Sequence, residues 1–212
     1  MAGQTGGPGA ACAPSGATVL VASAIRYALG ACALVTPGEM TRPTPCADWD
    51  LAALLAHLAA SMADLEMAIR TGTLDLDPLD PLDPLDPLDP DDPAGPEPDD
   101  ADPVEVLRDR AANLLFTCYA HHGPDRFVLV GGLPLPIGIV ACTGAVEIAV
   151  HGWDVSAARG RGGPIPPELA SRMLGLGPLL VTGREGLFGA PVHVPAQASP
   201  GDRLVAFLGR MP

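Results

Sequence analysis

Apolar residues recur at helical spacing along three stretches of the chain, residues 17–35, 51–71 and 103–119. Within each stretch they stand three or four positions apart, which places them on one face of a helix. The clearest stripe belongs to 51–71 and consists of Leu51, Leu54, Leu55, Leu58, Met62, Leu65 and Ile69. Pro37-Gly38 and Gly72 interrupt the pattern after the first two stretches. The pattern therefore predicts three amphipathic helices.

A fourth stretch, residues 139–159, is apolar nearly all round, which is typical of a helix buried on every side. Weaker patterns predict two C-terminal helices and a short hairpin, at residues 166–181, 202–210 and 127–135. The fold class that these elements predict is all-α, an up-down four-helix bundle with a C-terminal extension. We expect the bundle to span residues 17–212 after a loose tail of small residues, 1–16.

An acidic stretch interrupts the helical pattern at residues 74–102. It contains an Asp-Pro-Leu repeat, and it holds 12 of the 25 acidic residues and no basic residue. Frequent proline removes amide donors and uniform negative charge extends the chain, so we expect a disordered insert. A calcium-binding repeat is the alternative, although the turn-forming glycines of such repeats are missing.

The charge distribution and the cysteines indicate which partners and which cellular compartment to expect. Outside the insert 13 acidic residues face 12 basic ones and form no basic stripe, which argues against a nucleic-acid partner. The five cysteines show no CxxC pair, which is typical of a reduced, cytoplasmic protein. No uninterrupted apolar run reaches 18 residues and no signal peptide is visible, so no membrane partner is expected. A small molecule is the natural partner, and a homodimer remains open.

Glu147 is the one formal charge between Phe127 and Trp153. A carboxylate on a buried helix is costly unless something pairs with it. His151 lies four residues further on and therefore on the same helical face, so the two side chains can offer two ligands to one metal ion. His57 is the candidate for a third ligand. It falls on the flank of the apolar stripe of 51–71, where an exposed histidine is an equally good interpretation.

Other polar residues near these positions have two interpretations each. Asp154 is either a second-sphere or proton-accepting carboxylate or a solvent-facing helix end. Cys46 precedes a helix N-terminus, which favours a thiolate, but a buried structural cysteine fits as well. Arg203 and Arg210 can hold a substrate carboxylate or form surface ion pairs. Trp153 and Trp49 are expected to form wall and core rather than to take part in the chemistry, and His121-His122 to lie in an exposed loop.

Three motifs stand in a recognisable order: Thr44 to Asp50 (TPCADWD) with Leu54 to Leu58 (LLAHL), Glu147 to Asp154 (EIAVHGWD), and the ending DRLVAFLGRMP. Together they resemble an actinobacterial DinB-like family of the DinB/YfiT superfamily, similar to the N-terminal domain of mycothiol-dependent maleylpyruvate isomerase. The resemblance covers residues 17–72 and 103–212. It implies a four-helix bundle whose metal ligands are His57, Glu147 and His151.

The resemblance also implies a function. We expect a metal-dependent enzyme of the mycothiol-dependent transferase or isomerase type, which activates a low-molecular-weight thiol for addition to a small electrophile. Zn²⁺ is the default metal for such ligands, with Ni²⁺, Fe²⁺ and Mn²⁺ as alternatives. Asp154 and Arg203 are the candidate catalytic residues. The alternatives are a water-activating hydrolase or biosynthetic tailoring enzyme, and a non-catalytic, stress-associated metal-binding protein.

Overall fold

The computed structural model describes residues 14–46, 49–74, 102–123, 125–160, 163–180 and 189–212. Most of the predicted tail and of the predicted acidic insert lies outside the described residues. At the margins, Pro14 already begins a helix, Leu74 ends a strand, and Asp102 caps a helix.

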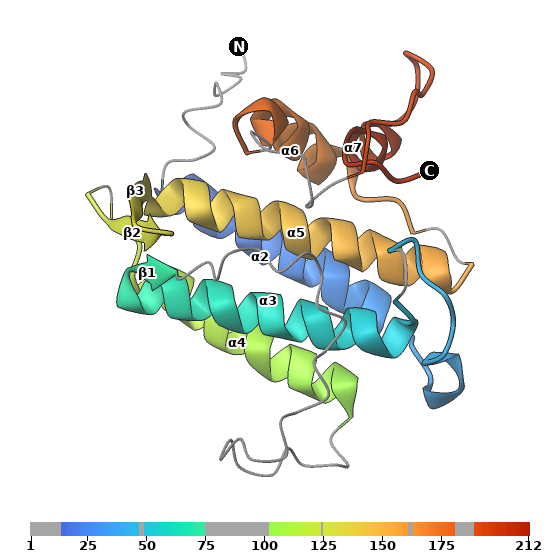
Figure 1. Ribbon diagram of the computed structural model, residues 1–212, viewed down its shortest axis with the longest axis horizontal. Helices are drawn as coiled ribbons and strands as arrows, with labels where there is room; N and C mark the ends of the chain where they lie inside the picture. Colours follow the sequence, from blue (N-terminus) through green and yellow to red (C-terminus); the bar gives the residue numbers. More distant parts are fainter. Residues whose placement is uncertain (1–13, 47–48, 75–101, 124, 161–162, 181–188) are drawn as a thin grey trace, which may run out of the picture.

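Four long helices form the bundle, and they confirm the predicted all-α fold class (Figure 1). They are α2 (Pro14–Cys32), α3 (Leu51–Thr71), α4 (Pro103–Ala120) and α5 (Ile137–Ala158). Helix α5 packs against α2 and α3, and α4 packs against the same two helices from the other side. The most apolar helix, α5, buries most of its residues, as its composition predicts.

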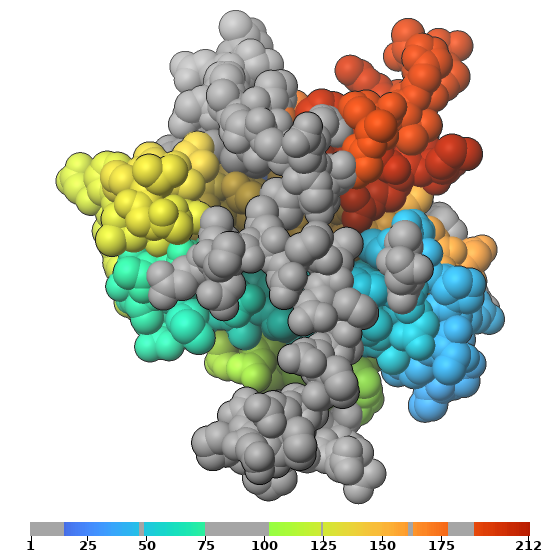
Figure 2. All heavy atoms as spheres, viewed as in Figure 1, coloured from blue at the N-terminus to red at the C-terminus, as the bar shows by residue number. Residues whose placement is uncertain are grey.

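The C-terminal extension consists of α6 (Pro167–Leu180) and α7 (Pro200–Phe207). Helix α6 contacts α5 and α2, and α7 packs against α6. Figure 2 shows residues 189–212, in red, on one side of the molecule and α3 and α4 on the opposite side. The extension therefore covers the α2–α5 side of the bundle.

A small sheet closes one end of the bundle. The predicted hairpin is present as β2 (Phe127–Val130) and β3 (Leu133–Pro136), and a strand that the sequence did not predict, β1 (Thr73–Leu74), pairs with β2 in parallel. Since β1 follows α3 directly and β2 follows α4, both helices end at this sheet and run parallel. The predicted up-down alternation is thus wrong between α3 and α4, because a long connection can return the chain to the opposite end.

Helix ends carry the caps that their residue types favour. The side chain of Asp50 accepts a hydrogen bond of 2.9 Å from the amide of Ala53 at the start of α3. Asp102 does the same for Val104 at the start of α4. Gly72 ends α3 in the left-handed conformation, with φ of 80°. These caps explain why the predicted bounds of α3 match the observed ones.

By length and composition, α2 and α3 are apolar enough to cross a membrane. Only half of the α2 window and 39% of α3 is buried inside the bundle. Core helices of soluble bundles pass the same test, so these two helices are weak evidence for a membrane protein. The expectation that the chain spans no membrane stays a prediction.

Candidate metal centre

Helix α5 places Glu147 and His151 on one face, one helical turn apart. The Nε2 atom of His151 lies 2.7 Å from Oε1 of Glu147. The His151 side chain is nearly fully buried, whereas that of Glu147 is 32% exposed. The predicted pairing of the isolated carboxylate with the histidine four residues on is therefore present in the structure.

His57 reaches the same point from α3. Its Nε2 atom lies 3.4 Å from the same Oε1 atom of Glu147, and its ring meets that of His151 edge-on with centroids 5.0 Å apart. Ser61, one turn further along α3, lies 3.3 Å from His57 Nε2. Of the two interpretations of His57, the structure favours the one in which a flank position faces a neighbouring helix.

The donor atoms of His57, Glu147 and His151 all lie within 4.8 Å of one another. Two imidazole nitrogens and one carboxylate oxygen suit Zn²⁺ and several other divalent metals. Ligand atoms around a tetrahedral ion at about 2.0–2.1 Å stand roughly 3.3 Å apart, close to the His57–Glu147 separation. The two side chains that are one-third exposed, His57 and Glu147, leave one side of the cluster open to solvent. The residues present thus fit a metal with an exchangeable position.

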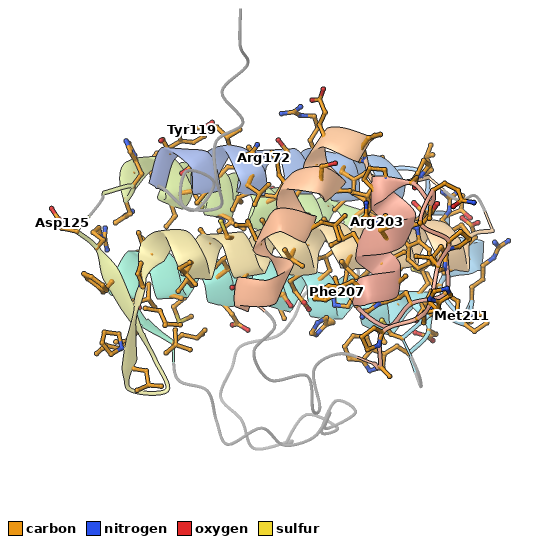
Figure 3. All side chains as sticks on the ribbon, turned by 90° about the horizontal axis from the view of Figure 1, so that it is seen from above. Tyr119, Asp125, Arg172, Arg203, Phe207 and Met211 are labelled. Atoms are coloured by element: carbon orange, nitrogen blue, oxygen red, sulfur yellow. The ribbon has the colours of Figure 1, made fainter. Side chains whose placement is uncertain are left out.

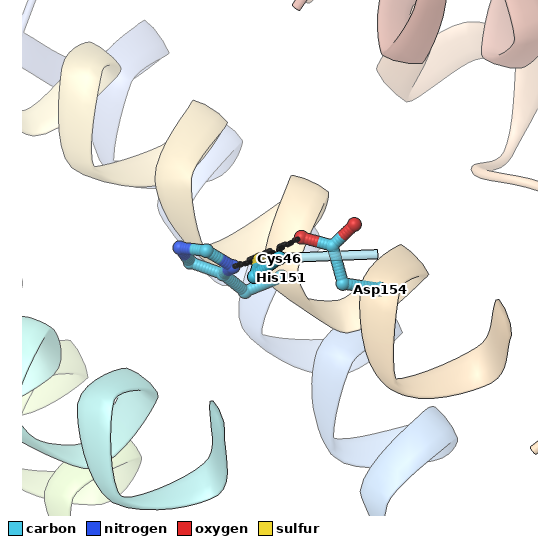
Figure 4. Close-up of side chains that lie close together, drawn as sticks. All are labelled: Cys46, His151 and Asp154. Carbon is cyan, nitrogen blue, oxygen red and sulfur yellow. Dashed lines mark hydrogen bonds and ion pairs between the residues drawn. The ribbon is translucent and has the colours of Figure 1, made fainter. Parts of the chain in front are cut away.

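Behind His151 lies a second layer of polar side chains (Figure 4). Its Nδ1 atom is 3.0 Å from Oδ2 of Asp154, a carboxylate that is fully buried. Cys46 donates to the same oxygen at 3.3 Å, and Arg210 donates to both oxygens at 3.0 and 3.3 Å. This arrangement settles the two interpretations of Asp154, because the side chain faces His151 rather than solvent.

The loop between α2 and α3 brings Cys46 and Trp49 to the cluster. The hydroxyl of Thr44 donates to the carbonyls of both residues, and Pro43 and Asp50 pair as an isolated bridge. The Trp49 ring lies 4.5 Å from that of His57, between centroids. Trp49 therefore forms a wall of the site beside His57.

The same loop is fastened to the end of α5. Arg159 donates to Glu39 at 3.2 Å, and both side chains are largely buried. Arg42 donates to the carbonyl of Arg159 at 3.2 Å. No pattern in the sequence indicates this pair, which joins residues 120 positions apart.

Electrostatics in the cluster favour a cation between the two helices. Burial would raise the pKa of Glu147, but the hydrogen bonds and charges of His151 and His57 hold it well below its usual range. Burial would lower the pKa of His151, but hydrogen bonds to Asp154, Cys46 and Glu147 raise it well above 6.5. The raised pKa of His151 favours the doubly protonated ring when no metal is bound. A divalent cation would replace the proton on Nε2.

Asp154 is ionised in this environment. Burial opposes ionisation, but the hydrogen bond from His151 and the charge of Arg210 outweigh it and lower the pKa of the carboxyl. A charged Asp154 accepts the Nδ1 proton of His151, which fixes the tautomer that presents Nε2 to a metal.

The two arginines of the C-terminal motif have different places. Arg203 lies exposed on α7 and, among the described residues, makes none of the contacts of the cluster (Figure 3). Arg210 lies just beyond α7 and reaches Asp154. The prediction of a catalytic role for Arg203 has no support in this placement. The two histidines of the predicted exposed loop, His121 and His122, follow α4 and stand apart from the metal ligands.

The His–Glu–His cluster lies between two helices of the bundle and is partly open to solvent. These features place the protein in the class of helical bundles that can hold a divalent metal. A family model described as the mycothiol maleylpyruvate isomerase N-terminal domain matches residues 21–156. The match spans more than half of the chain and contains all three candidate ligands, and the chain belongs to this family. The family is metal-binding and mycothiol-related, as the sequence motifs predicted.

Two curated relatives are uncharacterized proteins of Mycobacterium tuberculosis, from strains CDC 1551 / Oshkosh and ATCC 25618 / H37Rv. Each is 26% identical to this chain over 183 residues, which are 83% of this chain and 87% of the relative. No solved structure matches the chain significantly.

Proposed function

We propose that the protein is a metal-dependent enzyme that activates a low-molecular-weight thiol, such as mycothiol, for addition to a small electrophile. The observation that carries the proposal is the convergence of His57, Glu147 and His151 on one half-open point. Membership in a mycothiol-related family supports the choice of a thiol as co-substrate. A small-molecule substrate and a cytoplasmic location belong to the same proposal.

Each residue of the cluster has a distinct task in this scheme. His57, Glu147 and His151 would hold the metal, which when bound would favour the deprotonated form of a thiol near neutral pH. Asp154 orients His151 through Nδ1. Because Asp154 is fully buried, it orients the metal ligand His151 and does not contact a substrate. Trp49 shields one side of His57 and leaves the co-substrate to approach from the open side.

The first experiment measures bound metal in the purified protein and in two matched histidine variants. His57→Ala removes a ligand and should lose most of the metal, while His122→Ala removes an exposed histidine beyond α4 and should keep it. Equal metal content in both variants would show that His57 is not a ligand.

The second experiment supplies the metal-loaded protein with mycothiol and a panel of small electrophiles, and follows adducts by mass spectrometry. We expect turnover in the wild type and in His122→Ala, and none in His57→Ala. If the protein binds metal but neither binds the thiol nor forms adducts, the proposal of a thiol-dependent enzyme fails. The protein would then be a water-activating enzyme or a non-catalytic metal-binding protein.

A further inference from the structure

Arg210 holds the buried carboxylate behind the metal cluster. Its Nη2 and Nε atoms donate to the two oxygens of Asp154 at 3.0 and 3.3 Å. The Arg210 side chain is only 13% exposed and that of Asp154 is fully buried. A two-pronged guanidinium–carboxylate pair in a buried place fixes the plane of the carboxylate, and not only its charge.

The carboxylate in turn holds a candidate ligand. Oδ2 of Asp154, the atom that Arg210 Nη2 contacts, is also the atom that lies 3.0 Å from Nδ1 of His151. The opposite ring nitrogen of His151 faces Glu147 at 2.7 Å. A tilt of the Asp154 carboxylate would therefore turn the imidazole and displace the nitrogen that faces the metal position.

The turn of the chain after α7 places Arg210 at this point. Gly209 takes the left-handed conformation, with φ of 84°, and turns the chain back after α7. An added Cβ there would lie 2.6 Å from the backbone of Gly189, so the close approach of the two segments requires glycine. The amide of Arg210 donates to the carbonyl of Val205, and its Nη1 to that of Leu208.

We propose that Arg210 is a positioning residue of the metal centre, which orients His151 through Asp154. Arg210 stands 54 residues beyond the end of the range matched by the family model, 21–156. The C-terminal extension thereby completes a site whose ligands all come from the matched bundle. This inference rests on the metal centre of the proposed function, but not on the choice of substrate.

A purely structural ion pair is the competing explanation, and the chain offers a matched control for it. Arg159 and Glu39 form another buried pair at the end of α5, and neither is among the residues that contact Asp154 or the three ligands. Arg210→Met and Arg159→Met each remove one buried arginine from one carboxylate. Arg210→Lys keeps the charge but cannot form the two-pronged contact.

The test measures two quantities on each full-length variant: the melting temperature without metal, and the zinc dissociation constant by competition with a chromogenic chelator. We expect Arg210→Met to weaken zinc binding by up to about 10-fold, the lower end of the effect of losing a direct partner of a ligand, because Arg210 acts on His151 only through Asp154. Arg210→Lys should recover part of the loss. Arg159→Met should lower the melting temperature and leave the zinc constant within about twofold.

A spectroscopic readout separates orientation from stability. In the zinc-loaded protein, long-range ¹H–¹⁵N spectra report which ring nitrogen of His151 carries the proton and how uniform its environment is. Wild type and Arg159→Met should show one sharp Nδ1–H state, and Arg210→Met a broadened or mixed one. If Arg210→Met fails to fold, Arg210→Lys is compared with the wild type instead, and we expect the same change in the spectrum of His151 but a smaller one.

Two results would overturn the inference in distinguishable ways. If the wild type binds zinc but Arg210→Met and Arg210→Lys bind it equally well, Arg210 is only structural and the metal centre stands. If the wild type binds no stoichiometric zinc, the metal centre fails and the positioning role fails with it.

Discussion

Replacing Gly152 by alanine would push α5 away from α2 directly beside a candidate metal ligand. Gly152 follows His151 and packs against Ala28, where an added Cβ would lie 2.8 Å from the Ala28 Cα and 2.9 Å from its Cβ. Real Cβ atoms essentially never come that close to a backbone atom, so the two helices must shift. Glycine at this position is therefore a condition for the close approach of α5 to the backbone of α2.

The size of the effect follows from two opposing contributions. Alanine is favoured over glycine within a helix by about 1 kcal/mol, whereas overpacking a well-packed contact costs about 1–3 kcal/mol. Gly175 on α6 is the matched control, because it is exposed and an added Cβ meets nothing within 4 Å. The helix preference is common to both substitutions, so their difference leaves the steric cost of about 1–3 kcal/mol.

Thermal unfolding of the two variants measures this difference. For a domain of this size 1 kcal/mol corresponds to about 2–4 °C, so Gly152→Ala should melt about 2–12 °C below Gly175→Ala. Because the strain reaches His151, Gly152→Ala should also bind zinc less tightly. The reasoning is refuted if Gly152→Ala melts at or above the temperature of Gly175→Ala.

Two further outcomes follow from the cluster. The raised pKa of His151 contributes stability that is fully present below about pH 6.5 and is lost as pH rises through the folded-state pKa. The metal-free protein should therefore melt lower at about pH 8 than at pH 6.5, while the upward shift caused by zinc grows, and His151→Gln should flatten both trends. A metal-free melting temperature that rises over this interval would contradict the assignment. Zinc should also change tryptophan fluorescence through Trp49, whose ring lies 4.5 Å from His57. Trp49→Phe should abolish that change and Trp153→Phe should keep it; the reverse would place the metal elsewhere.

Most of the fold could be predicted because local signals agree with one another. The apolar stripe of 51–71, its capping Asp50 and its terminating Gly72 all indicate the same helix. The parallel course of α3 and α4 could not, because helical periodicity carries no direction and the connection between them is long. The two-residue strand β1 is too short to show a pattern of its own.

The residues of the candidate site could be predicted from the sequence to different extents. Glu147 and His151 follow from helical spacing alone, since one turn of one helix brings them together. His57 required the family resemblance, because a flank position is compatible with solvent as well as with a neighbouring helix. Nothing in the sequence indicates which of the two arginines, Arg203 or Arg210, reaches the cluster. The turn after α7, with Gly209 in the left-handed conformation, brings Arg210 into the cluster.

The contact between His57 and Glu147 joins two residues that are 90 positions apart. The acidic stretch 75–101 lies inside the loop that this contact closes. In an unfolded chain the entropic cost of closing a loop rises only with the logarithm of its length. Removing all 27 residues of 75–101 would change that cost by about 0.3 kcal/mol. The length of chain between His57 and Glu147 thus contributes little to the loop-closure cost of the centre, and a longer or shorter connection would change that cost only slightly.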